Sequence, residues 1–428
     1  MIPTLIVLFV VGLATAVIAW LPRKKEATAL AAVAVLLLVG QLLGFFPADK
    51  ALASISLPVV LILLSIGIFA SVFGASGVFE RICRQIVILA RGDQRLLIPS
   101  FLLLTYGLSA LLPNLTCLYV LLPLMIGSLR AVGMHDARLK RSIVALVIAS
   151  NLGGASTMIG DFPNILISRS QGIPFMEFIH WMTPACLALL ALLFVLSLGR
   201  GDFQAPAPFH RRVLTEMIRQ QTETLRVNMR LLVPAAVAFG LMLCALIFTG
   251  WFPFPPELVC VVCACLCVWC LPEPQHWATQ IDVKSTLFIA CLFIFAGAIE
   301  STGVLSVVAA EVLRYAGGDP LRIAGSLIIL AFLLTAFFSA GPTTAVLIPI
   351  AQGLGDKLPG NMVWWCLSLG VLAGSSTTLL SATAGPIAAN LLSSQAGIEL
   401  GYRDFLRLGW KVGLGFCAVS LGYVWLRL

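Results

Sequence analysis

Residues 150–164 interrupt an apolar segment that is long enough to cross a lipid bilayer. The run contains three glycines, a proline, two asparagines and an aspartate. In hydrocarbon, a helix can be broken only where its freed backbone groups are buried in protein or face a water-filled cavity. An ionisable side chain at that depth indicates a functional site. The run is therefore typical of the unwound centre of a helix in a membrane transporter.

The composition predicts an all-α polytopic membrane protein. The chain is 60% hydrophobic and 11% charged, whereas soluble proteins carry roughly 25% charged residues. Its formal net charge of +8 comes from basic residues in short loops between apolar segments, which is the pattern that the positive-inside rule produces. We therefore expect a lipid bilayer around the protein and no nucleic-acid partner. The compact length and short loops favour a bacterial inner membrane.

The first apolar segment, residues 2–21, is expected to be a retained helix. No basic region precedes it and no small-residue cleavage site follows it, unlike a signal peptide. Five of the twelve cysteines lie within residues 260–270 in apolar surroundings, so we expect them to pack as small hydrophobes. An enzyme is not expected, because the sequence has no HExxH motif and its four histidines fall in or beside predicted loops.

Apolar runs and basic loops predict an outside N-terminus and many membrane crossings. Two amphipathic stretches, 77–91 and 303–315, are predicted to lie in the membrane interface. The predicted spans are 2–21, 27–46, 53–74, 140–168, 181–199, 231–250, 256–271, 284–300, 361–392 and 408–427. The predicted domains are N-terminal helices (1–50), a first inverted repeat (51–199), a cytoplasmic linker (200–230) and a second inverted repeat (231–428).

The apolar segment 97–129 is too long for a single upright span. As one helix it would measure about 50 Å, against a hydrocarbon core of roughly 30 Å. Basic residues flank it on both sides, so both ends are expected in the cytoplasm. These features predict a re-entrant helical hairpin with Pro113 and Asn114 at its tip. The alternative is one strongly tilted or kinked span.

The second half of the chain repeats the order of the first. Residues 108–123 align without gaps on residues 334–349, with Ala110 and Ala336 among five identical positions. Identity this low also arises by chance in apolar sequence. However, a Gly-Val pair opens both interfacial stretches, and an interrupted helix follows each long apolar segment. Inverted repeats with paired interrupted helices indicate a secondary transporter with a site near the bilayer midplane.

Four motifs carry a resemblance to a known family. Residues 153–164, Gly-Gly-Ala-Ser-Thr-Met-Ile-Gly-Asp-Phe-Pro-Asn, are similar to the Gly-Gly-x-x-Thr-x-Ile-Gly-Asp-Pro-Pro-Asn signature of arsenite permeases and the melanosomal P protein. Residues 112–123 and 338–349 resemble two hairpin tips, and residues 374–384 resemble a second broken helix. By these motifs the chain, over about residues 50–428, resembles the ion transporter superfamily. That superfamily also includes divalent anion/sodium symporters and citrate transporters.

The resemblance implies two inverted repeats, each with a re-entrant hairpin and a broken transmembrane helix that meet at a central site. It also implies a homodimer in which a transport domain slides like an elevator against a scaffold domain. Substrates across the superfamily include di- and tricarboxylates, sulfate, arsenite, and sodium ions exchanged for protons. No cofactor is implied beyond a coupling sodium ion or proton.

The motifs also depart from the family pattern. Phe162 stands where the signature has its first proline. The symporters carry Ser-Asn-Thr at both hairpin tips, whereas residues 113–116 and 340–343 here read Pro-Asn-Leu-Thr and Ala-Gly-Pro-Thr. The arsenite and P protein branch has an aspartate before the tip asparagine, where this chain has Pro113 and Ser339. The coupling ion and the branch of the superfamily therefore stay open.

The candidate binding residues lie in the hairpin tips and the helix breaks. Helix N-termini there present N–H groups suited to an oxyanion, and unwound carbonyls suit a cation. No lysine or arginine lies near the breaks, so dipoles, amides and a co-bound cation would hold an anion. The candidates are Asn114, Thr116, Asn151, Gly153, Gly154, Thr157, Gly160, Asp161, Pro163, Asn164, Gly341, Thr343, Thr344, Ser376, Thr377, Thr378 and Thr383. Candidate neighbours of a sodium ion are Asn114, Gly153, Thr343 and Ser376.

Asp161 is the only carboxylate inside either break. It is a candidate cation ligand, a candidate carrier of a coupled proton, or only the cap of the half-helix that follows. For the serines and threonines, the alternative to a site role is packing or hydrogen bonding to their own helix. For Gly153 and Gly154, the alternative is close helix packing.

The sequence therefore favours a secondary transporter of a small anion, either a di- or tricarboxylate or an inorganic oxyanion, coupled to sodium or protons. The alternative within this class is an arsenite or antimonite efflux permease, or a sodium/proton antiporter. The Gly-Asp-Phe-Pro-Asn sequence favours that alternative, and the missing hairpin aspartates count against it. A passive channel and a membrane-embedded enzyme are disfavoured, because the sequence has neither rings of charge nor a catalytic grouping.

Overall fold

A computed structural model describes residues 2–20, 24–198, 226–248, 254–273, 283–337, 339–382 and 384–428. Every regular element in these ranges is a helix, as the composition predicts. Six of the helices, α4, α7, α10, α12, α17 and α21, are long and apolar enough to cross a membrane. The predicted linker 200–230 lies mostly outside the described residues.

The helices of the first half follow one another with short connections. They are α1 (Ile2–Trp20), α2 (Lys25–Leu42), α3 (Ala48–Ala53), α4 (Leu57–Ala75), α5 (Val78–Leu89), α6 (Gln94–Ser109), α7 (Asn114–Ala131), α8 (Asp136–Ser156), α9 (Phe162–Gln171) and α10 (Phe175–Leu198). The helices of the second half are α12 (Met229–Ile247), α13 (Pro256–Trp269), α15 (Val283–Glu300), α16 (Val304–Ala316), α17 (Pro320–Phe337), α18 (Ala340–Leu354), α19 (Met362–Ser375), α20 (Gly385–Ala396) and α21 (Tyr402–Arg427). A short 3₁₀ turn, Gly355–Lys357, follows α18.

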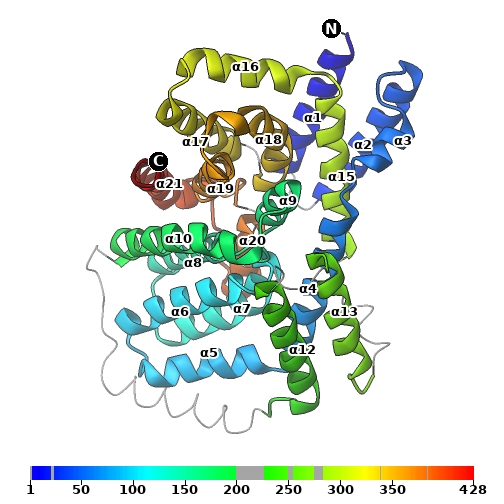
Figure 1. The fold of residues 1–428 in the computed structure, drawn as a ribbon. Coiled ribbons are helices and arrows are strands. Elements are labelled where there is room, and N and C mark those ends of the chain that lie inside the picture. Colours follow the sequence, from blue (N-terminus) through cyan, green and yellow to red (C-terminus); the bar gives the residue numbers. More distant parts are fainter. Residues whose placement is uncertain are drawn as a thin grey trace.

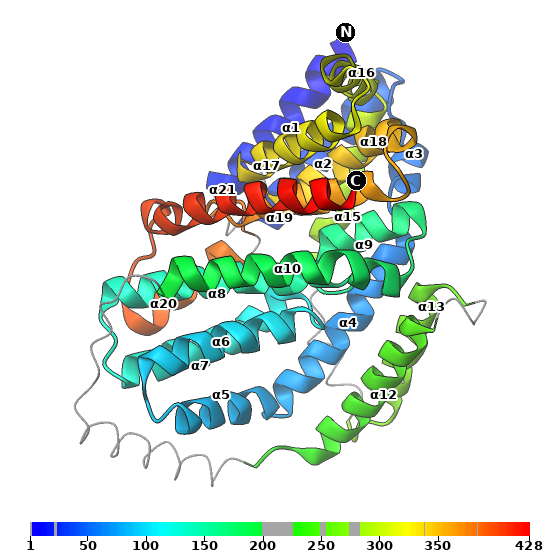
Figure 2. The same ribbon diagram turned by 60° about the vertical axis from the view of Figure 1, so that its left-hand side comes forward.

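The same order of helices occurs twice, from α4 to α10 and from α15 to α21. In each run a long helix is followed by an amphipathic helix, α5 or α16, which begins directly after a glycine. Gly77 and Gly303 have φ angles of 77° and 71°, a left-handed conformation that glycine adopts without strain. The two amphipathic helices lie at opposite ends of the molecule in both views (Figure 1, Figure 2).

The long apolar segment 97–129 is two helices rather than one kinked span. The helices α6 and α7 meet at residues 110–113, where Pro113 precedes the first residue of α7. A second long apolar segment, residues 321–352, divides in the same way into α17 and α18. The first interrupted helix breaks at residues 157–161, between α8 and α9. The second breaks between α19 and α20. The re-entrant position of both helix pairs in the bilayer stays a prediction.

Some helix boundaries differ from the apolar runs. The helix α10 begins at Phe175 rather than at residue 181, and α21 begins at Tyr402 rather than at residue 408. Both first turns carry an acidic residue, which the helix dipole favours at an N-terminus. A polar first turn is still helical. Hydropathy alone therefore places the start of such a helix several residues too late in the sequence.

The two runs of helices pack into each other. The helices α1 and α2 of the first half pack against α15, and α12 and α13 of the second half pack against α4. The helix α8 packs against α6, α7 and α10, while α19 packs against α17, α18 and α21. Each half-helix that follows a break crosses over: α9 packs against α18, and α20 packs against α7. The helices α10 and α21 lie side by side between the two groups (Figure 2).

Candidate transport site

A cavity of about 90 Å³ lies where the α6–α7 turn, the first helix break and the start of α18 meet. The α6–α7 turn, the break and the start of α18 supply most of the polar lining, whereas the lining from α4 and α15 is apolar except for Thr286. Among the sequence candidates, the lining includes Asn114, Thr116, Gly160, Asp161, Pro163 and Gly341. The apolar wall includes Leu63, Leu64, Ile289 and Leu292. The cavity thus lies between the broken helices and two intact helices.

Three helix N-termini converge on this cavity. The helix α9 is capped, because the Asp161 Oδ1 atom accepts a hydrogen bond of 2.9 Å from the Phe162 backbone N–H. The helices α7 and α18 follow Pro113 and Ser339, and neither residue makes a side-chain capping hydrogen bond. An uncapped helix N-terminus carries partial positive charge and unpaired N–H groups. These two helix ends therefore direct partial positive charge at the cavity, where the first N–H of α7 is already bonded to the Gly160 carbonyl and the N–H groups that follow directly have no partner among the described residues.

Asp161 is the only ionisable residue among the described residues that line the cavity. Its geometry is that of a helix cap, which is one of the three roles that the sequence left open. A carboxylate at the N-terminus of α9 compensates that helix dipole. When it is ionised, it also repels an anion in the same small cavity, and this repulsion disappears when a proton or a metal cation neutralises it.

Two buried donors near the cavity have no hydrogen-bond partner among the described residues. They are the Asn114 Nδ2 atom and the Thr343 Oγ1 atom. Asn114 is 3% exposed and Thr343 is 4% exposed. Buried polar groups are nearly always paired, so an unpaired one calls for a ligand, an ion or ordered water. Asn114 also binds the break through its backbone, since its N–H donates to the Gly160 carbonyl at 3.2 Å.

The glycines of the first break lie in close contacts that leave no room for a side chain. A Cβ atom at Gly153 would lie 2.9 Å from the carbonyl carbon of Tyr106 on α6 and closer still to its oxygen. A Cβ atom at Gly154 would lie 3.0 Å from the Asp161 Cβ atom. One at Gly160 would lie 2.5 Å from the Ser109 carbonyl oxygen. Gly153 and Gly154 do not line the cavity, whereas Gly160 does.

Thr157 and Asn164 hold the broken helix in shape. The Thr157 hydroxyl donates to the Ala110 carbonyl of the α6–α7 turn and accepts from the Gly160 N–H at 3.2 Å. The Asn164 Nδ2 group donates to the Gly154 and Thr157 carbonyls at 3.1 and 3.3 Å. The Asn164 Oδ1 atom accepts from the Ser368 hydroxyl at 2.9 Å. Both side chains are thus committed to the protein itself.

The second break is anchored by the same kind of contact. A Cβ atom at Gly374 would lie 2.5 Å from the Phe332 carbonyl oxygen on α17. The Thr378 hydroxyl donates to the Ala336 carbonyl at 3.1 Å and accepts from the Ser381 N–H at 3.0 Å. In both breaks, a glycine meets the first helix of the preceding pair, and a threonine four residues later bonds to the C-terminal end of that helix. Ala110 directly follows α6, and Ala336 lies in the last turn of α17.

The remaining candidates of the second half point into their own helices. The Ser376 hydroxyl donates to the Leu372 carbonyl at 2.9 Å, and the Thr377 hydroxyl donates to the Ala373 carbonyl at 2.9 Å. The Thr344 hydroxyl donates to the Ala340 carbonyl at 2.8 Å. Ser376, Thr377 and Thr344 do not line the cavity, and Thr383 lies outside the described residues.

Asn151 connects the two breaks directly. Its Nδ2 group donates to the Ser375 carbonyl at the end of α19, at 3.1 Å. This bond joins α8 to α19, the two helices that each end at a break. Asn151 therefore couples the halves of the molecule and does not line the cavity.

Comparison with known proteins decides the class. A family model described as citrate transporter matches residues 6–370. The chain belongs to the citrate transporter family. This membership confirms the predicted relation to the ion transporter superfamily. This member of the citrate transporter family is an integral multi-pass membrane protein and a transporter, not an enzyme.

Similar proteins align over most of the chain. The magnetosome protein MamN of Magnetospirillum gryphiswaldense is 28% identical over 92% of this chain and 92% of its own length. An uncharacterized transporter of Mycobacterium tuberculosis is 28% identical over 88% of this chain and 87% of its own length. A 46 kDa membrane protein of Mycobacterium leprae is 29% identical over 86% of both chains.

One cavity residue of this member of the citrate transporter family was not among the predicted binding residues. The sequence marked Phe162 only as a difference from the family signature. Phe162 lines the cavity, and its ring packs edge-on against Phe293 of α15, with 6.1 Å between ring centroids. A Cβ atom at Gly341 would lie 3.1 Å from the Phe162 ring. Phe162 thus joins α9, α15 and α18, and Gly341 is small because the ring occupies that space.

Proposed function

We propose that this member of the citrate transporter family is a secondary active transporter of a small anion, coupled to sodium or protons. The observation that carries the proposal is that the uncapped N-termini of α7 and α18 face one cavity together with the Asp161 carboxylate. Two helix dipoles attract an anion, while the carboxylate repels it until a cation binds. Coupling then follows from electrostatics, because anion and cation enter more favourably together than either does alone. A di- or tricarboxylate or an inorganic oxyanion fits this scheme.

We propose that α4–α10 and α15–α21 are inverted repeats whose helix pairs, α6–α7 and α17–α18, are re-entrant hairpins. The matching glycine and threonine contacts at the two breaks support the repeat. The positions of α5 and α16 at opposite ends of the molecule support the inversion (Figure 1). An elevator movement against α4 and α15, in a homodimer, agrees with the apolar wall of the cavity, because apolar surfaces slide without breaking hydrogen bonds.

One observation also favours the second candidate, an arsenite or antimonite efflux permease or a sodium/proton antiporter. No lysine or arginine is present among the described residues that line the cavity, and one carboxylate is. Such a lining accepts a neutral solute or a cation without a co-bound ion.

The test is transport by the purified protein in proteoliposomes. Succinate, citrate, sulfate, phosphate and arsenite would be offered under an imposed sodium gradient or an imposed pH gradient, with choline as the control cation. Accumulation of one anion that requires the gradient would support the proposal. Sodium/proton exchange with no anion movement would favour the second candidate. Folded protein that accumulates no anion under either gradient would refute anion transport.

Asp161→Asn removes the negative charge of Asp161 but keeps a side chain that can cap α9. Asparagine caps helices about as well as aspartate, so we expect an unchanged melting temperature. We expect gradient-driven accumulation to be abolished, because the coupled cation loses its countercharge. The matched control is Asp49→Asn, which makes the same change at an exposed position of α3. Normal coupled transport by Asp161→Asn would mean that Asp161 is only a cap.

A further inference from the structure

A second, larger cavity lies away from the transport site, where α8 begins, α10 ends and α21 begins. Its volume is about 910 Å³, and its lining includes Lys140, Arg141, Arg407 and Lys411. None of the transport-site candidates contributes to it. The start of α8 carries basic residues that the positive-inside rule assigns to the cytoplasm. The cavity is therefore expected at the cytoplasmic end of these helices.

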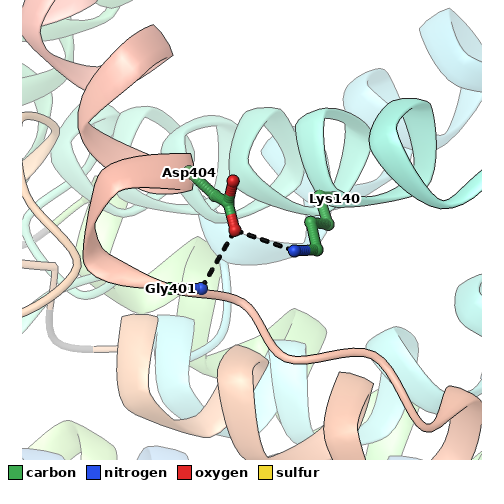
Figure 3. Close-up of polar contacts among 3 residues, drawn as sticks. All are labelled: Lys140, Gly401 and Asp404. Carbon is green, nitrogen blue, oxygen red and sulfur yellow. Dashed lines mark hydrogen bonds and ion pairs between the residues drawn. The ribbon is translucent and has the colours of Figure 1, made fainter.

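The acidic residues in this cavity are largely neutralised by ion pairs. The Lys140 Nζ atom of α8 lies 2.9 Å from the Asp404 Oδ2 atom on α21, which also accepts from the Gly401 N–H at 3.2 Å (Figure 3). Asp136 pairs at 2.8 Å with Arg130, which lies outside the lining. The remaining acid in the lining, Glu399, is exposed to solvent.

Neither Arg407 nor Lys411 makes a direct hydrogen bond or ion pair among the described residues, and the Arg407 charge interacts with the Asp404 carboxylate one turn earlier on α21. They are four residues apart on α21 and so lie on one face of that helix. The guanidinium group of Arg141 is held differently, because its Nη2 atom donates to the Leu196 carbonyl at the end of α10. Lys140, Arg407 and Lys411 together outnumber the Asp404 carboxylate, so this side of the cavity keeps an excess of positive charge that attracts a negatively charged group from outside the protein.

An exposed apolar surface adjoins these cations. Val195 at the end of α10 lines the cavity and is 68% exposed. Trp410 and Leu414 on α21 are 48% and 46% exposed. The helix α21 is a candidate membrane span with basic residues in its first turns, which is where a bilayer changes from headgroups to acyl chains. Basic pockets between membrane helices on the cytoplasmic side suit lipid headgroups.

We propose that this cleft binds the phosphodiester headgroup of an anionic phospholipid. Arg407 and Lys411 hold the phosphate, and the acyl chains lie along the exposed apolar side chains of α10 and α21. A lipid at this position bridges α8 and α10 of the first run to α21 of the second. The proposal does not depend on which solute the protein transports.

The test is binding by the purified full-length protein in neutral detergent, followed by native mass spectrometry. The probes are short-chain phosphatidylglycerol, short-chain phosphatidylcholine and glycerol phosphate. We expect phosphatidylglycerol to bind in preference to the other two. Arg407→Gln and Lys411→Gln should each weaken its binding about tenfold, the loss of one charge-assisted hydrogen bond. Arg407→Lys, which keeps the charge, should restore most of the affinity and show that the fold is intact.

The matched control is Arg403→Gln. Arg403 is exposed on α21, one turn before Arg407, and does not line the cavity. We expect this variant to bind phosphatidylglycerol as the unmodified protein does. Equal weakening by Arg403→Gln, or no weakening by Arg407→Gln and Lys411→Gln, would overturn the site. Glycerol phosphate that binds as tightly as phosphatidylglycerol would overturn the lipid as its occupant.

Discussion

Gly153→Ala should destabilise the protein, because the added methyl group has no room. The new Cβ atom would lie 2.9 Å from the Tyr106 carbonyl carbon, whereas carbon atoms normally touch at about 3.5–4.0 Å. The helices α6 and α8 would therefore have to separate by roughly 1 Å. Overpacking of a buried contact costs about 1–3 kcal/mol. Because this contact also positions the α6–α7 turn, we expect the rate of transport to fall as well.

The same substitution at Gly127 is the matched control. Gly127 lies inside α7, and a Cβ atom there would meet nothing within 4 Å. Alanine in place of an unconstrained helical glycine stabilises by about 0.4–1 kcal/mol. Thermal unfolding in detergent should therefore shift in opposite directions for the two variants. Gly374→Ala should behave like Gly153→Ala, because its Cβ atom would lie 2.6 Å from Thr335. If Gly153→Ala melts at the temperature of Gly127→Ala, the packing argument is wrong.

Two further variants address the contacts around α9. Asn164→Ala removes one hydrogen bond to Ser368 and two to backbone carbonyls. Thermal unfolding should therefore show that the free energy of unfolding falls by about 2–3 kcal/mol. An unchanged melting temperature would contradict this. Glu257→Gln weakens the 2.6 Å ion pair that joins Arg169 of α9 to α13. If α9 moves past α13 during transport, this variant should exchange labelled substrate in proteoliposomes about tenfold faster. An unchanged exchange rate would mean that the Arg169–Glu257 ion pair does not limit the movement of α9.

The breaks in the helices were predictable because their signals are local. Glycine, proline and asparagine inside an apolar segment have few structural roles other than a break, and the interruption at residues 157–161 lies inside the predicted run 150–164. The division of 97–129 at Pro113 follows from the same reasoning and from segment length. The short helix α3 was not predicted, because its residues are neither continuously apolar nor regularly spaced.

The identity of the cavity residues was only partly predictable, because side-chain partners come from distant parts of the chain. Asn114 and Asn164 are equivalent as residue types, yet Asn164 is satisfied by Ser368 of α19 while the Asn114 Nδ2 atom has no partner among the described residues. Leu63 and Leu292 line the cavity from helices whose sequences resemble any other membrane span. Pattern alone does not distinguish such residues from lipid-facing ones.

The two helix breaks are held by the same kind of glycine and threonine contact, but their polar residues differ. Gly153 and Gly374 occupy equivalent contacts, yet only the first break supplies a carboxylate, and only the first break lines the cavity. The glycine contacts therefore fix the geometry of both breaks, while the Asp161 carboxylate determines the charge of the ligand that the cavity binds. It follows that Gly153→Ala and Gly374→Ala should each reduce stability and transport together. Asp161→Asn should reduce coupled transport alone. A variant set in which Asp161→Asn lowers the melting temperature as much as Gly374→Ala would mean that geometry and chemistry are not separable at this site.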